Sequence, residues 1–224
     1  MIAAVELDTS KQELARDTFR ICPDIDLYTL DRGCGSCVHA TPFCRKTCYK
    51  LKYYKMYPKA MRKRDRRNER MWDALTAERF AAWAATRRYE VDRFRWCTRG
   101  EPFATIDDVF KLRDVMQANA STDFWLPTRG WHNPQLRRPI VNMIRPLPNA
   151  FVMASVDPSD APWKVRSLED GGWSTMFYGD DSNDGRRGRV LCPKTWFKDS
   201  GLTCATCGIC WTKEQTHLHL KQHT

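Results

Sequence analysis

Three cysteines lie at two-residue intervals near the end of the chain. They are Cys204, Cys207 and Cys210, and a fourth, Cys192, lies twelve residues before the first of them. This C-x2-C-x2-C spacing with one remote thiol is typical of loops that hold an iron–sulfur cluster, and Gly208 relaxes the backbone between two of the ligands. Tetrahedral zinc is the alternative, because CxxC knuckles also form zinc sites. The spacing therefore predicts a metal centre, with a [4Fe–4S] cluster preferred over zinc.

A second group of four cysteines lies near the start of the chain. Cys34, Cys37, Cys44 and Cys48 form the pattern C-x2-C-x6-C-x3-C directly after a predicted strand over residues 25–30. Loops that leave a strand are common positions for functional groups. Two interpretations stay open: this group holds a second [4Fe–4S] cluster or a zinc ion of its own, or some of its thiols join the C-terminal ones at one shared site. Since each group supplies four ligands, we favour two sites.

The other cysteines and the histidines of the tail are weaker candidates. Cys22 and Cys97 are expected to pack as small buried hydrophobic residues. His217 and His223 follow Cys204 and Cys207 and would complete a Cys2His2 zinc site, but the intervening gap is short for a zinc finger and Cys210 would be left over. We expect these histidines, with His219, to be surface residues or part of a frayed helix end.

Composition limits the class of protein. The chain has 224 residues, of which 42% are hydrophobic and ten are cysteines, so it has enough apolar material for one folded core. Acidic residues interrupt the first ten positions before any signal-peptide core forms, and no apolar run is long enough to span a bilayer. Metal-bound thiols in a reducing cytoplasm, that of the host cell if the chain is phage-encoded, therefore explain the cysteines better than disulfide bonds.

Positive charge is concentrated in one segment. The net charge is +10, and seven of the twelve residues between Lys59 and Arg70 are basic. A helix there is expected either to present a solvated face or to contact the phosphates of a nucleic acid or another polyanion. The candidates for phosphate contact are Arg62, Lys63, Arg64, Arg66 and Arg67.

Strand and helix patterns alternate along the middle of the chain. Strands are predicted over residues 25–30, 91–97, 123–127, 149–156, 173–178 and 189–191, and helices over 9–20, 58–89, 105–119, 132–145 and 162–169. This alternation predicts an α/β fold with parallel strands, either a small or incomplete TIM-like barrel or an open sheet. We expect a single domain: an extension over 1–25, a barrel core over 26–191 that includes the cysteine loop 34–48, and a cysteine-rich loop and tail over 192–224. In a closed barrel the first and last strands are neighbours, so both cysteine loops would lie at one rim.

Polar side chains near predicted strand ends are candidates for catalysis. Arg95 and Arg129 would bind an anion in the barrel mouth, with Glu101 or Asp157 as a carboxylate base. The alternative is ordinary anchoring of loops by hydrogen bonds and ion pairs. No phosphate-loop, dinucleotide or nucleophile-elbow motif narrows the choice. Radical S-adenosylmethionine chemistry is disfavoured, because Leu51 occupies the place of the third thiol in its C-x3-C-x2-C motif.

The cysteine layout resembles that of the phage gene product 88 family. The resemblance spans residues 26–211 and includes these segments: 36–49 (Ser-Cys-Val-His-Ala-Thr-Pro-Phe-Cys-Arg-Lys-Thr-Cys-Tyr), 94–96, 100–103, 126–129, 154–157, 192–193 and 204–211. It departs from the family pattern at Glu101, where an aspartate is usual, and at Arg129, where a lysine is usual. The resemblance implies a small iron–sulfur protein on a reduced TIM-barrel-like fold, with no assigned activity.

These features together predict an iron–sulfur cluster-binding protein with a redox or regulatory role. Two alternatives stay open. One is an enzyme that works in the barrel mouth with the cluster as Lewis acid or electron relay. The other is a zinc-stabilised protein that binds nucleic acid through the basic helix.

Overall fold

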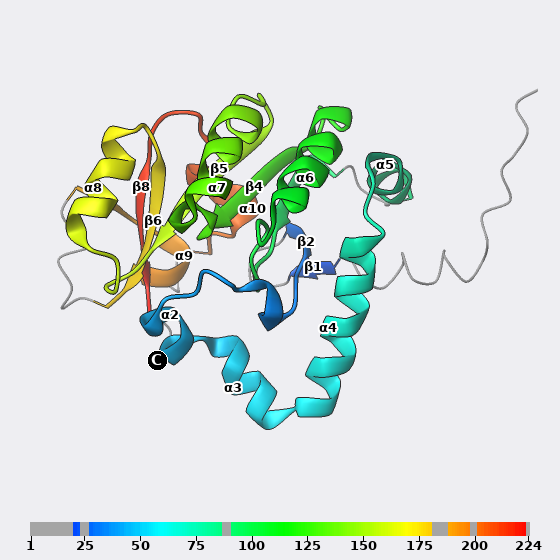
Figure 1. Cartoon of the computed structure of the whole chain (residues 1–224), viewed down its shortest axis with the longest axis horizontal. Helices are drawn as coiled ribbons and strands as arrows, with labels where there is room; N and C mark the ends of the chain where they lie inside the picture. The colour runs from blue at the N-terminus through cyan, green and yellow to red at the C-terminus, as the bar shows by residue number, and fades with distance from the viewer. Residues whose placement is uncertain (1–19, 23–26, 87–90, 181–187, 198–200, 223–224) are drawn as a thin grey trace, which may run out of the picture.

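The structure is a computed structural model that describes residues 20–22, 27–86, 91–180, 188–197 and 201–222 (Figure 1). The helix predicted over residues 9–20 and the side chain of Cys22 lie outside this part, as does most of the loop before Gly188. No helix in the described ranges is long and apolar enough to cross a membrane.

A single eight-stranded sheet forms the centre of the molecule. Its strands, in spatial order, are β1 (Arg20–Cys22), β2 (Leu27–Leu30), β3 (Arg93–Trp96), β4 (Asp123–Thr128), β5 (Ala150–Val156), β6 (Ser174–Gly179), β8 (His217–Lys221) and β7 (Val190–Leu191). Only β1 runs antiparallel to its neighbour, and the other seven strands are parallel. The six predicted strands are all present, and β1 and β8 are additional.

The sheet is open, so the expectation of a barrel is wrong while the α/β class is confirmed. β2 pairs with β1 and β3, and β7 pairs only with β8, so the two cysteine loops leave strands near opposite edges of the sheet. The expectation that neighbouring first and last strands bring both loops to one rim is therefore also wrong. The short antiparallel strand β1 lies at one edge of the sheet and β7 at the other, and a closed barrel would require these two edges to pair.

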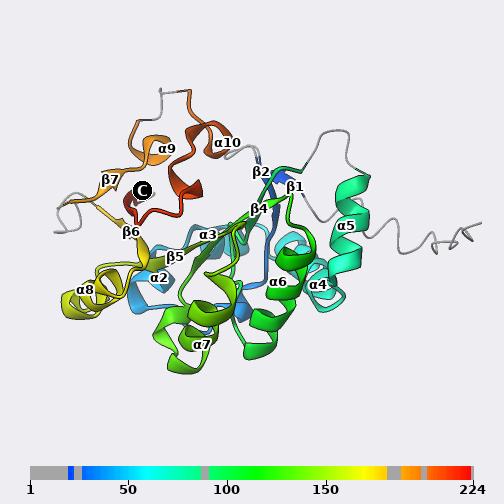
Figure 2. The same cartoon turned by 90° about the horizontal axis from the view of Figure 1, so that it is seen from above.

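Helices cover the sheet unequally. They are α2 (Pro42–Thr47), α3 (Tyr49–Met56), α4 (Pro58–Asp73), α5 (Ala77–Ala85), α6 (Ile106–Ala118), α7 (Pro134–Pro139), α8 (Pro162–Asp170), α9 (Pro193–Trp196) and α10 (Cys204–Cys207). Figure 2 shows α6, α7 and α8 on one side of the sheet, and α9 and α10 on the other. The first side therefore carries the main helical layer, and the C-terminal cysteine segment covers the second.

The main core lies between the sheet and the helical layer. Alternate residues of the strands face it, among them Phe94, Trp96 and Phe124, all fully buried. Helix α5 contributes Phe80, whose ring lies 5.2 Å from that of Phe94 and 5.3 Å from that of Phe124. Each such aromatic contact contributes about 0.5–1.5 kcal/mol beyond burial, so this cluster stabilises the packing of α5 against β3 and β4.

Local sequence explains where the helices begin. Thr105 and Asp108 form a capping box at the start of α6, and Thr76 caps α5. The cap at Thr76 divides the helix predicted over residues 58–89 into α4 and α5. A proline inside the segment predicted over 132–145 is accommodated because α7 ends at Pro139, and a π-helical stretch, Ile140–Ile144, follows it.

The tail histidines are not surface residues or a frayed helix end, so that prediction is wrong. His217 and His219 lie on β8, between β6 and β7, and His219 is fully buried. Nδ1 of His217 and the Thr175 hydroxyl form a hydrogen bond of 2.8 Å. His223 lies outside the described residues. The segment His-Leu-His-Leu-Lys does alternate polar and apolar residues, which is the pattern of a half-buried strand, so this signal could have identified β8.

Candidate metal centres

The first group of thiols lies on a short loop-and-helix segment after β2. A single 3-10 turn, Cys34–Ser36, carries the first thiol, and Cys37 ends it. Helix α2 carries Cys44, and Cys48 lies at the break between α2 and α3, with extended backbone. Because of this break, Cys44 and Cys48 do not share one helix face as a continuous helix would require.

Electrostatic interactions link the four thiols of this group. Burial is the main cause that raises the pKa of Cys37 to about 12, and Glu101, Cys34 and Cys44 also contribute to this rise. Burial also raises the pKa of Cys34 and of Cys44, and in both cases the neighbouring Cys48 adds to the effect. Each thiol therefore interacts electrostatically with two others, which places the four in one region of the structure.

Two cations lie against the first thiol group. Lys50 opposes the rise in pKa at Cys34 and Cys37, and Arg129 hydrogen-bonds Cys44 and opposes the rise there. A cluster held by thiolates is anionic, so cations at this position favour the deprotonated ligands that a metal centre needs.

The first thiol group lies across the carboxyl ends of the parallel strands. Thr41, which caps α2, also donates a hydrogen bond to Asp157 at the end of β5. Gly100, after β3, approaches Arg32 so closely that an added Cβ would lie 2.7 Å from the Arg32 Cβ. Its φ of +92° is likewise a conformation that suits glycine. The carboxyl edge is where open α/β sheets usually bind their ligands.

The second thiol group lies on the opposite side of the sheet from the main helical layer. Cys192 caps the short helix α9, and Cys204 and Cys207 are the first and last residues of α10. Gly208, at a φ of +77°, then turns the chain into the 3-10 segment Ile209–Trp211 that contains Cys210. The left-handed backbone at this glycine allows the chain to turn sharply between the two short helices that carry Cys207 and Cys210.

The four thiols of the second group also affect one another's pKa values. Burial is the main cause that raises the pKa of Cys204 to about 11; Arg95 opposes the rise, and Cys192 and Cys207 contribute to it. Burial raises the pKa of Cys210 strongly, and the other three thiols of the group add to it. In each case the thiols that raise a pKa belong to the same group, so the described cysteines fall into two groups.

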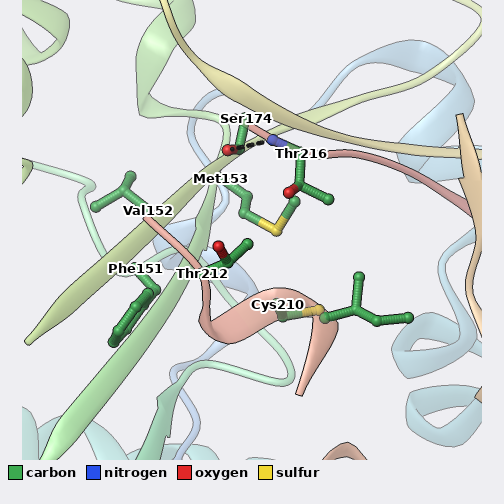
Figure 3. A pocket seen from close by; sticks show the side chains of 8 residues that line it. Phe151, Val152, Met153, Ser174, Cys210, Thr212 and Thr216 are labelled. Carbon is green, nitrogen blue, oxygen red and sulfur yellow. Dashed lines mark hydrogen bonds between the residues drawn. The ribbon is translucent and has the colours of Figure 1, made fainter. Parts of the chain in front are cut away.

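Apolar side chains separate the second group from the strands beneath it. Cys210 and Trp211 pack on a cluster that includes Trp125 and Phe151, and the Trp211 indole N–H donates to the carbonyl of Cys204 at 3.3 Å. Trp211 therefore places an apolar side chain against the second thiol group. Figure 3 shows a small cavity beside Cys210, and its volume of about 10 Å³ is room for about one water molecule.

Two buried donors on the same face have no hydrogen-bond acceptor among the described residues. They are Nε of Arg95 and Nε1 of Trp125. The Arg95 guanidinium carbon lies 4.2 Å from the centre of the Trp125 ring, so the two donors are neighbours. Buried donors normally find acceptors, and N–H groups directed at cluster sulfurs are a common way to satisfy them. The donors and the four thiols together fit an iron–sulfur cluster.

The four candidate catalytic residues fall into two places. Glu101, Arg129 and Asp157 lie together at the carboxyl edge, whereas Arg95 lies on the face of the second thiol group. Arg129 pairs with Asp157, and its backbone N–H donates to Glu101 at 2.8 Å. Burial raises the pKa of Glu101 to about 7 despite the hydrogen bonds that it accepts. The structure thus joins three of the four through direct contacts.

Sequence spacing identified the thiols but not the groups that surround them. Lys50 is a buried lysine inside a basic segment, and its Nζ donates to the Arg32 carbonyl at 2.6 Å. His132 Nε2 lies 3.0 Å from a carboxylate oxygen of Asp160 at the same edge. Neither position belongs to a motif, so only the fold could reveal them. In the part of the chain that the structure describes, no three Cys, His, Asp or Glu side chains are arranged to hold a single metal ion.

The fold and the two thiol groups define a class: a small open α/β protein whose cysteines are collected at two places on one sheet. The family model described as Gene product 88 matches residues 6–213, and the chain belongs to this phage protein family. No curated protein and no solved structure matches the chain.

Proposed function

We propose that this protein holds two [4Fe–4S] clusters, one on each thiol group, and serves in electron transfer or redox-dependent regulation in the host cytoplasm. The observation that carries the proposal is the gathering of four cysteines at each of two separate places. Cys34, Cys37, Cys44 and Cys48 would ligate the first cluster, and Cys192, Cys204, Cys207 and Cys210 the second. Soft thiolate ligands suit iron–sulfur clusters and zinc alike.

The cations and donors around the thiols support clusters over isolated thiols. Lys50 and Arg129 lie against the first group, and Arg95 against the second. Bound clusters supply one-electron redox chemistry, and their potential depends on net charge, N–H donors and exposure. Arg95 and Trp125 would set these properties at the second centre, since both present buried donors there.

The test is anaerobic purification followed by iron, sulfide and zinc analysis. The proposal expects a brown protein with about eight irons, four for each cluster, and a thiolate-to-iron charge-transfer band in the visible. Cys37→Ser and Cys207→Ser should each remove about half of the iron. Cys97→Ala, which removes a buried thiol outside both groups, is the matched control and should retain it. A colourless protein loaded with zinc would overturn the proposal in favour of structural zinc sites.

A second candidate function is an enzyme that works at the carboxyl edge with the first cluster as Lewis acid or electron relay. The contact between Arg129 and both Glu101 and Asp157, beside the first thiol group, favours it. A Lewis-acid role requires an iron that a small ligand can reach. Added cyanide should then change the electron paramagnetic resonance spectrum of the reduced protein, and an unchanged spectrum would exclude the Lewis-acid form.

A further inference from the structure

Helices α2, α3 and α4 follow one another along the lower side of the molecule in Figure 1, and together they carry a set of exposed cations that we call the α2–α4 surface. The surface is defined by its exposed cations: Arg45, Lys46, Lys52, Lys55, Lys59, Arg62, Lys63, Arg66 and Arg70. Acidic residues do little to offset them. Asp65 is buried against Lys50, Glu69 pairs with Arg32, and only Asp73 of the three acidic residues between 42 and 73 is exposed.

Helix α4 separates its cations from the residues that pack. Met61, Asp65, Asn68 and Trp72 are buried and occupy one face. The exposed residues Lys59, Arg62, Arg66 and Arg70 occupy the opposite face at the spacing of successive helical turns. A stripe of this kind matches the spaced negative charges of a phosphate backbone.

The structure changes the set of residues predicted to bind phosphate. Arg62, Lys63 and Arg66 are exposed on the surface. Arg64 instead pairs with Asp31 at 2.6 Å, and Arg67 is half-buried. The inward residues fix α4 to the loop after β2 and leave the outward ones for a ligand.

Helix α3 adds exposed apolar and aromatic side chains between the cations. Tyr57, at its junction with α4, is 60% exposed, and Tyr53 is 40% exposed. Lys55 and Lys59 flank Tyr57 two residues on either side. Exposed rings among cations are the combination by which proteins bind single strands, because bases stack on the rings while the cations contact phosphates. In a duplex the bases are already stacked on one another, so no base face is free to stack on an exposed ring.

We propose that the α2–α4 surface binds single-stranded nucleic acid, with its cations on the phosphates and Tyr57 stacked on a base. This proposal does not rest on the presence of a cluster. The contacts that hold α3 and α4 in place are all between protein groups. Lys50 Nζ lies 3.1 Å from the Asp65 carboxylate and 2.6 Å from the Arg32 carbonyl, and Asn68 donates to the Asp31 carbonyl at 2.9 Å.

The test is fluorescence anisotropy of labelled single-stranded DNA and RNA oligonucleotides with the full-length protein. Binding should weaken strongly between about 50 mM and 200 mM salt, because phosphate contacts release counterions. The variant Lys55→Glu/Lys59→Glu/Arg62→Glu/Lys63→Glu should lose at least about tenfold in affinity. Tyr57→Ala should lose on the order of fivefold or more for single strands, the range of base stacking, and leave duplex binding unchanged.

A variant of equal charge change on the helical layer is the matched control. Arg137→Glu/Arg138→Glu/Lys164→Glu/Arg166→Glu reverses four exposed cations on α7 and α8, far from α3 and α4 in Figure 1. It should retain most of the affinity, and circular dichroism should show that both variants fold. Equal losses in the two variants would overturn the surface assignment. So would tighter binding to duplex than to single strands, or binding to anionic phospholipid vesicles without binding to oligonucleotides.

Discussion

Arg129 lies between two buried carboxylates at the carboxyl end of β4. It pairs with Asp157 and, at 3.4 Å, with Asp160, and the three side chains are at most 9% exposed. A buried charge that loses its partner is far more costly than an exposed one. The residue therefore holds the ends of β4 and β5 together in addition to its contact with Cys44.

Replacing this arginine should destabilise the fold markedly. Arg129→Met leaves the carboxylates of Asp157 and Asp160 without their cation, and we expect a loss of about 3–5 kcal/mol in the free energy of unfolding, measured by urea denaturation. Arg113→Met is the control, because Arg113 pairs with Asp114 at an exposed position. The control should change stability by less than about 1 kcal/mol. Similar losses in both variants would contradict the structural role of Arg129.

Glu101 gives a prediction about pH. Its pKa is 4.5 in the unfolded chain and about 7 in the fold, because the carboxyl is buried. The neutral form is therefore the one that folding favours. Stability is full below about pH 4.5, falls as the pH rises through this window, and levels off above about pH 7, with a total loss of about 3 kcal/mol.

The variant Glu101→Gln has no carboxyl to titrate at this position, so comparing its stability with that of wild type isolates the contribution of Glu101 to the pH dependence. Urea denaturation at about pH 5 and about pH 8 should show that wild type loses more stability than Glu101→Gln over this range, by up to about 3 kcal/mol. Glu214→Gln, at an exposed position, should follow wild type. If wild type and Glu101→Gln lose stability in parallel, the carboxyl is already ionised at the lower pH.

At the scale of elements, sequence patterns located most of the fold but not its closure. Capping residues such as Thr105 and apolar runs such as 149–156 specify an element locally, so α6 and β5 appear where they were predicted. The pairing of β8 between β6 and β7 depends on contacts between residues 42 apart, as in Thr175 and His217, and 28 apart, as in Val190 and Leu218, which no local pattern contains. The strand order of the open sheet depends on that pairing, so it could not be predicted from the alternation of strand and helix patterns alone.

Backbone conformation at Gly208 gives a prediction for the second thiol group. A side chain would meet no atom within 4 Å, so the cost of Gly208→Ala arises from the left-handed φ of +77° alone. We expect a loss of about 1–2 kcal/mol in stability and a lower iron content, because Cys210 follows this turn. Gly35→Ala in the first thiol group is the control: it also has open space but no positive φ. Equal iron content in the two variants would show that the turn does not position Cys210.

At the scale of the whole molecule, the first thiol group and the basic surface share helix α2 and its junction with α3. Helix α2 carries Cys44 and the exposed Arg45, and it has no buried residue of its own. Its described anchors include the bond from Thr41 to Asp157, that from the Phe43 N–H to Ser159 and the contact between Arg129 and Cys44. A cluster on Cys44 and Cys48 would therefore add a strong restraint to one end of the surface. The second thiol group lies across the sheet and shares no helix with it.

This arrangement predicts that the two centres differ in their effect on nucleic-acid binding. Cys37→Ser removes the first cluster and leaves α2 less ordered, so binding must order several side chains and should weaken by on the order of tenfold. Cys207→Ser removes the second cluster and should leave the affinity within about twofold of wild type. Anisotropy under anaerobic conditions measures both. Equal effects of the two substitutions would show that the surface does not depend on the first centre, whether or not it binds single strands.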